Sequence, residues 1–114
     1  MPKGQDQIAE AAALCRALAG EVEALAASPG EQADLRARLE ALGARLEALQ
    51  GTFFVKMAPA LRYVGACLAA AVALGEALVP GAAVAELGEK LAAVEAATKT
   101  LEDRASAAGS MTIT

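Results

Sequence analysis

Apolar residues recur three or four positions apart along most of this 114-residue chain, in four consecutive stretches. The stretches cover residues 8–25, 35–49, 54–78 and 84–101. This spacing places each row on one stripe of an α-helix, and no segment shows the period-two alternation of a half-buried strand. Aromatic residues make up only 3% of the chain, so the material for a β-core is also missing. The pattern predicts an all-α fold.

Turn signals separate the four stretches. Ser28 and Glu31 form a capping box in which each side chain satisfies a free backbone N–H, with proline at the first helical position. Glycine-containing pairs at 51–52 and 80–81 mark the other two boundaries. We therefore predict helices over residues 6–27, 29–50, 53–79 and 82–107.

Matched helix lengths and short loops favour an antiparallel up-down-up-down four-helix bundle made of two tandem helical hairpins. Residues 1–108 would form this single alanine-rich domain, with coiled-coil-like seams, and residues 109–114 a polar tail. The predicted core contains Ile8, Leu18, Val22, Leu39, Leu42, Leu46, Leu61, Val64, Leu68, Leu87, Leu91 and Val94. Pairs of opposite charge four residues apart are expected at Asp34–Arg38, Glu86–Lys90 and Glu95–Lys99.

Pro59 conflicts with a regular third helix, because proline removes a backbone hydrogen bond and clashes with the preceding turn. We expect a helix kinked at this position. The alternative is an irregular segment over 52–57 and a regular helix from near Ala58, with Phe53 and Phe54 covering the end of the bundle.

The third predicted helix is apolar nearly all round, whereas a bundle helix needs only one apolar face. Its main stripe, which includes Leu61, Val64 and Leu68, is assigned to the core. The surplus face is covered either by neighbouring helices or by another chain or a lipid surface. The candidate interaction surface comprises Phe53, Ala60, Cys67 and Leu74 at spacing seven, with the small residues Gly65, Ala69 and Ala73.

This assignment makes a prediction about substitutions. Replacing Leu42 or Leu68 with aspartate should unfold the domain, because an unpaired charge would lie in apolar surroundings. Replacing Leu74 with aspartate should spare the fold and weaken association.

The sequence has few of the residue types and motifs that catalyse reactions or bind metal ions. The chain has no histidine, so the usual proton shuttle and commonest metal ligand are missing, and two cysteines alone cannot complete a zinc site. No glycine-rich phosphate loop is present. We expect no enzymatic activity, no cofactor and no metal, and we expect Cys15 and Cys67 to be small core residues.

Fourteen acidic against ten basic residues give a net charge of −4, which argues against nucleic-acid binding. No secretory signal is evident, and the uncharged run over 63–75 is shorter than the roughly 18–20 residues of a membrane-spanning helix. These features predict a cytoplasmic location.

The sequence thus favours a non-enzymatic helical module that binds a protein partner or itself through the third helix, with a homo-oligomer preferred. One alternative is a membrane- or lipid-surface-active bundle, which is not favoured because the chain has few Lys and Arg and no Trp. The other is a repeating subunit of a larger helical assembly.

Overall fold

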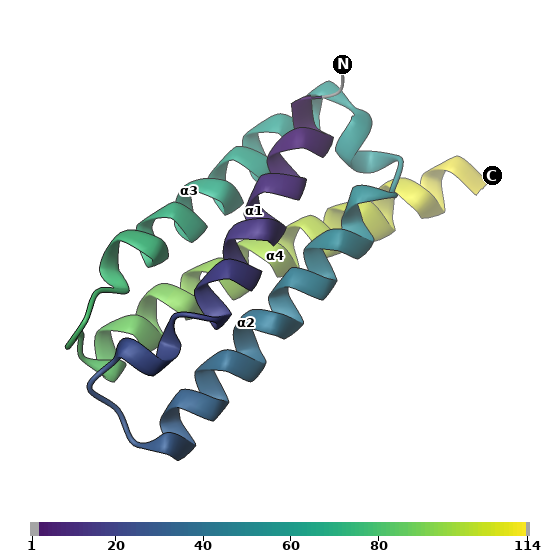
Figure 1. Cartoon of the computed structure of the whole chain (residues 1–114). Helices are drawn as coiled ribbons and strands as arrows, with labels where there is room; N and C mark the ends of the chain where they lie inside the picture. The colour runs from purple at the N-terminus through teal and green to yellow at the C-terminus, as the bar shows by residue number, and fades with distance from the viewer. Residues whose placement is uncertain (1–2, 114) are drawn as a thin grey trace.

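The computed structural model describes residues 3–113, except for the side chains of Lys3 and of residues 109–113. This part of the chain is all-helical and contains no β-strand, as predicted (Figure 1). The four α-helices are α1 (Lys3–Ala19), α2 (Pro29–Gln50), α3 (Leu61–Ala77) and α4 (Val84–Ile113).

The helices lie along a long axis in a body of 50 × 23 × 18 Å, and consecutive helices run in opposite directions (Figure 1). The most extensive packing joins α1 to α2 and α3 to α4, and α1 also packs closely on α3. The contact between α2 and α4 is smaller. One hydrophobic core joins all four helices. Of the predicted core residues, Leu61 and Leu68 are not fully buried, and the others are.

The start of α2 follows the capping-box prediction. The Glu31 backbone N–H donates to the Ser28 Oγ at 3.2 Å, and the Ser28 N–H donates to the Glu31 Oε1 at 3.0 Å. These two bonds satisfy donors that no intrahelical partner can reach. The helix then continues to Gln50, as the sequence predicts.

Helix α1 ends earlier than predicted. It stops at Ala19, just before Gly20, a residue that disfavours the helix. A 3₁₀ turn, η1 (Val22–Ala24), keeps Val22 buried beyond the helix end. The Gln32 amide nitrogen lies 3.4 Å from the Leu25 carbonyl oxygen and so caps the turn from α2. The apolar residues over 8–25, which the sequence assigns to one helix, therefore belong to a helix and a separate turn.

The predicted kinked helix through Pro59 is wrong, and the irregular alternative is closer to the structure. Two 3₁₀ turns, η2 (Phe54–Lys56) and η3 (Ala58–Ala60), precede α3, with Met57 extended between them. Proline clashes with a continuous helical backbone, so the chain leaves the helical conformation and restarts.

The turns before α3 close one end of the molecule. Phe54 and Val55 are buried, whereas Phe53 is 61% exposed, so the two phenylalanines do not act as a covering pair. The N-terminal turn of α1 lies directly against η2, and a Cβ at Gly4 would overlap the carbonyl oxygen of Val55. Glycine is therefore required at position 4 by this close approach.

Gly81 lies in the turn between α3 and α4 with a φ of 82°, in the left-handed region that glycine adopts without strain. Its N–H donates to the Ala24 carbonyl at 3.3 Å, which ties this turn to η1. At the other end, α4 continues past Ala108. Of the predicted polar tail, residues 109–113 extend the helical backbone, and Thr114 lies outside the described residues.

Candidate interaction site

Helix α3 carries two apolar stripes, and the structure buries the one that the sequence assigns to an interaction surface. Ala60, Cys67 and Leu74 are each at most 2% exposed, so their prediction as interaction residues is wrong. Leu61, in contrast, is 36% exposed, and Leu68 is only partly buried. The buried stripe therefore combines Ala60, Cys67 and Leu74 with Val64, Ala71 and Leu78 of the predicted core stripe, while Leu61 and Leu68 lie toward the outside.

The turns before α3 explain why α3 is rotated about its axis relative to the orientation predicted from the sequence. Pro59 interrupts the helix, and Phe54 and Val55 in the preceding turn η2 are buried in the core. The last 3₁₀ turn, η3, ends with the side chain of Ala60 buried. The inward stripe of α3 includes the small residues Cys67 and Ala71, which allow neighbouring helices to pack closely. Because both stripes are apolar, their periodicity alone cannot select one.

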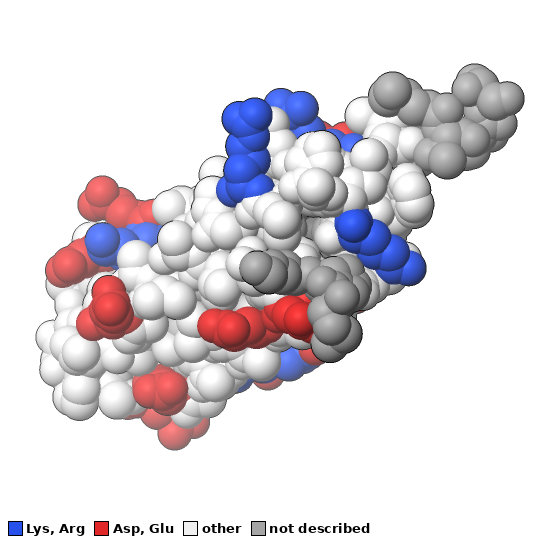
Figure 2. Space-filling view, turned by 90° about the horizontal axis from the view of Figure 1, so that it is seen from above, with Lys and Arg blue, Asp and Glu red and all other residues white. Residues whose placement is uncertain are grey.

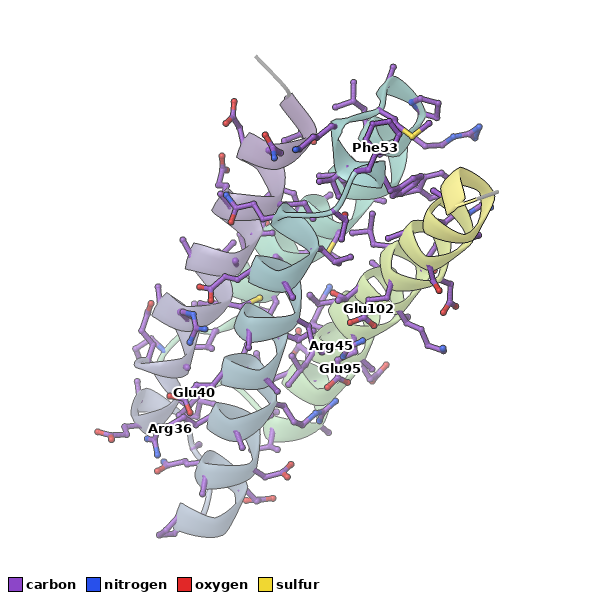
Figure 3. All side chains as sticks on the ribbon, turned by 90° about the vertical axis from the view of Figure 1, so that its right-hand side faces the viewer. Arg36, Glu40, Arg45, Phe53, Glu95 and Glu102 are labelled. Atoms are coloured by element: carbon purple, nitrogen blue, oxygen red, sulfur yellow. The ribbon has the colours of Figure 1, made fainter. Side chains whose placement is uncertain are left out.

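The other predicted surface residues lie toward the outside. Ala69 is exposed, and Gly65 and Ala73 are half-buried on α3. Phe53 is exposed too, but it precedes η2 and lies at the end of the molecule (Figure 3). The predicted set is therefore divided between the core, the outer side of α3 and one end of the fold.

A groove of about 440 Å³ runs between α1 and α3 on the outer surface. Its apolar floor is formed by Leu14 and Leu18 from α1 and by Val72 and Gly75 from α3. Val72 is 40% exposed. A Cβ at Gly75 would lie only 3.7 and 3.8 Å from methyl carbons of Leu18 and Leu14. The groove is therefore deeper here than it would be with a larger residue at position 75.

Three carboxylates form the rim of this groove: Glu10 on α1, Glu21 just before η1 and Glu76 on α3. All three are exposed, no lysine or arginine lines the groove, and none of the three forms an ion pair within the described part of the chain. Sequence reasoning did not identify the α1 half of this site. The signal available was Leu14, which lies beside the main stripe of its helix and between two glutamates.

The opposite seam, between α2 and α4, is charged but internally balanced. Arg38 binds Glu95 through two hydrogen bonds of 3.0 and 2.6 Å. Arg45 binds Glu102 through two of 2.9 and 2.7 Å, and Figure 3 labels this second pair. The two pairs are one heptad apart on each helix. A second groove of about 390 Å³ lies beside the Arg45–Glu102 pair.

Two of the pairs predicted within single helices are replaced, one by a cross-helix bond and one by another pair within α4. Arg38 binds Glu95 rather than Asp34, and Lys99 lies 3.5 Å from Asp103 rather than pairing with Glu95. A planar guanidinium held by both carboxylate oxygens is a stronger arrangement than a mobile pair along one helix face. Arg45 lowers the pKa of Glu102 through their hydrogen bonds and its positive charge.

Cations also gather around Tyr63, close to the start of α3. The guanidinium carbons of Arg62 and Arg104 lie 5.4 and 4.5 Å from the centre of the Tyr63 ring. The Phe54 ring lies 6.4 Å from that of Tyr63. These cations therefore contact an aromatic side chain of the same chain.

Both cysteines are buried, as predicted. Burial raises the pKa of Cys15 to about 11 and also raises that of Cys67, whose Sγ lies 3.6 Å from the Thr98 Oγ1. At neutral pH both thiols are protonated and therefore weakly nucleophilic. Among the described residues no cluster of three His, Cys, Asp or Glu side chains could hold a metal ion.

One segment in the described range, Ala58–Ala77, is long and apolar enough to cross a membrane by length and composition. It contains Arg62 and Glu76, and 28% of its most apolar stretch of 18 residues is buried. Core helices of soluble proteins meet the same criterion.

No protein-family model, curated protein or solved structure matches this chain.

Proposed function

We propose that this chain is a non-enzymatic helical interaction module that docks a protein partner on the groove between α1 and α3. The proposal includes the finer architecture, an antiparallel up-down-up-down bundle of two tandem hairpins, because the helix directions and the close α1–α2 and α3–α4 packing agree with it. A cytoplasmic location remains part of the proposal.

One observation carries it: the outer side of α3 is apolar where a solvent-facing helix is normally polar. From 63 to 75 the helix has no charged residue, yet Val72 is 40% exposed and, beyond the helix end, Val79 is 50% exposed. Figure 2, which looks onto the side of the molecule where α3 lies, shows a broad surface without Lys, Arg, Asp or Glu between scattered charged groups. Exposed apolar area of this kind is typical of a surface that a partner covers.

Site-specific photo-crosslinking in the native host tests the proposal. A photoreactive amino acid at Val72 should give an adduct of defined mass, because this side chain lies in the groove. The matched control is the same amino acid at Ala44, on the exposed side of α2, which should give none. The substitution Gly75→Leu, which fills the groove, should suppress the Val72 adduct.

Absence of any Val72 adduct, or equal yields at both positions, would overturn the proposal. An adduct of twice the chain mass would make the partner a second copy, as in a homo-oligomer or a repeating assembly.

A lipid-surface function is the second candidate, and the apolar segment Ala58–Ala77 favours it. The carboxylates on the groove rim oppose binding to an anionic bilayer, whose surface potential attracts basic groups. Co-sedimentation with anionic and with neutral vesicles distinguishes the two candidates, since a docking module should remain in the supernatant with both.

A further inference from the structure

We infer that the partner segment bound between α1 and α3 is a basic amphipathic helix; this rests on the function proposed above. The inference comes from the charges around the groove. Glu10, Glu21 and Glu76 border an apolar floor, and no cation in the described part of the chain neutralises them by an ion pair.

Other glutamates on helix seams behave differently. Glu47 is held by Arg16 at 2.7 Å, and Glu95 and Glu102 are held by arginines of α2. Where this chain joins two of its own helices with charges, it supplies both signs. At the α1–α3 groove it supplies only the negative sign, so complementary cations would have to come from the partner.

The spacing of the rim fits a helix. Glu10 lies on α1, and Glu21 lies two residues beyond the end of this helix at Ala19. The nine helical steps from Glu10 to Ala19 alone span about 14 Å, or two and a half turns. Leu14 on α1 and Val72 on α3 both belong to the apolar floor of the groove. An amphipathic helix of three or four turns would place its apolar stripe on this floor. Its lysine or arginine stems would extend over the apolar surface to the carboxylates on the rim.

The same charges disfavour two other occupants. In a two-fold symmetric dimer through this groove the same patch would face itself, which would bring one acidic rim against another. An anionic membrane surface would present further negative charge to Glu10, Glu21 and Glu76. A basic segment is the occupant that the rim attracts.

Fluorescence anisotropy with a labelled peptide of leucine and lysine tests the inference. The probe has about 14 residues, with leucines at i, i+3, i+4 and i+7. It should bind the full chain, and added salt should weaken the binding. The triple variant Glu10→Gln/Glu21→Gln/Glu76→Gln should bind the peptide about tenfold or more weakly, since three exposed charge pairs are lost.

The matched control is Glu40→Gln/Glu86→Gln/Glu89→Gln, which changes the net charge by the same amount at exposed positions outside the groove. It should bind almost as tightly as the unmodified chain. Gly75→Leu should abolish binding without any change in charge. A peptide with glutamate in place of lysine should not bind.

Equal weakening by both triple variants, binding of the glutamate peptide, or no binding of the lysine peptide would overturn the inference. So would a dimer in sedimentation, or attachment to anionic vesicles, that Gly75→Leu abolishes. If the lysine peptide does not bind while the crosslink at Val72 persists, the partner chemistry is wrong and the interaction module stands. If both are absent, the proposed function fails as well.

Discussion

The two sides of this molecule join helices in different ways. On the α2–α4 side, where the helices make their smaller contact, Arg38 and Arg45 bind Glu95 and Glu102 with two hydrogen bonds each. On the α1–α3 side, an apolar groove is bordered by carboxylates that make no ion pair within the described residues. The first side satisfies its own charges. The second leaves both apolar surface and negative charge exposed, which is a pattern expected of a binding surface rather than of a structural seam.

The largest expected effect separates the buried from the outer stripe of α3. Leu74→Asp should abolish cooperative unfolding, because an unpaired carboxylate at a site 2% exposed costs several kcal/mol of the roughly 5–15 kcal/mol that stabilise a domain. Leu68→Asp should leave a folded protein. This reverses the expectation from sequence for these two positions. Thermal unfolding followed by circular dichroism checks it, and two equally unfolded variants would contradict the assignment of the stripes.

A smaller effect is expected at the charged seam. The double variant Arg38→Glu/Arg45→Glu should lower the free energy of unfolding by about 1–2 kcal/mol, because four carboxylates would then face one another. The four side chains are each about a third exposed, so solvent screens much of their interaction. Urea denaturation measures the change. Adding Glu95→Arg and Glu102→Arg should restore stability, and failure to do so would mean that apolar packing alone joins α2 to α4.

Lowering the pH should also destabilise the contact between α2 and α4, with a smaller change in the free energy of unfolding than the charge reversal. Arg45 lowers the pKa of Glu102 below its usual value of 4.5, so the folded protein binds a proton there less readily than the unfolded chain. The resulting stability is complete above about pH 4.5 and is lost as the pH falls through the lowered folded-state pKa. We expect a contribution below about 1 kcal/mol. Glu102→Gln should reduce the pH dependence of unfolding between neutral and acidic solution, and an unchanged profile would contradict this role.

The smallest effect is expected at the groove. Glu10→Gln/Glu21→Gln/Glu76→Gln should change the free energy of unfolding by no more than about 0.5 kcal/mol, because these exposed side chains form no ion pair in the described part of the chain. Urea denaturation beside the unmodified protein measures it. A loss above about 1 kcal/mol would show that the rim stabilises the fold and would remove the contrast between the two sides.

Local chemistry explains which elements could be predicted. Helix α2 begins and ends where the sequence places it, because its start is set by the Ser28–Glu31 capping box and its buried leucines all fall on one stripe. The end of α1 was missed because Val22 continues the helical spacing from within a separate 3₁₀ turn. Periodicity records which residues are buried, and a turn can bury a residue at the same interval as a helix.

The candidate site was predicted only in part. The sequence pointed to α3 as the helix with surplus apolar surface, but it chose Ala60, Cys67 and Leu74, which are buried. Glu10 and Leu14 were not recognised, because their role depends on the packing of α1 against α3 rather than on their own helix.

By itself, the sequence determined that this chain folds into helices, where α2 begins and ends, and that one helix is apolar on more than one face. These properties depend on residues a few positions apart. Only the tertiary structure decided which face of α3 points inward, which arginine binds which glutamate, and that unpaired carboxylates border an apolar groove. These outcomes depend on how helices distant in sequence rotate and pack against one another, and two apolar stripes of one helix compete for the core on nearly equal terms until that packing is formed.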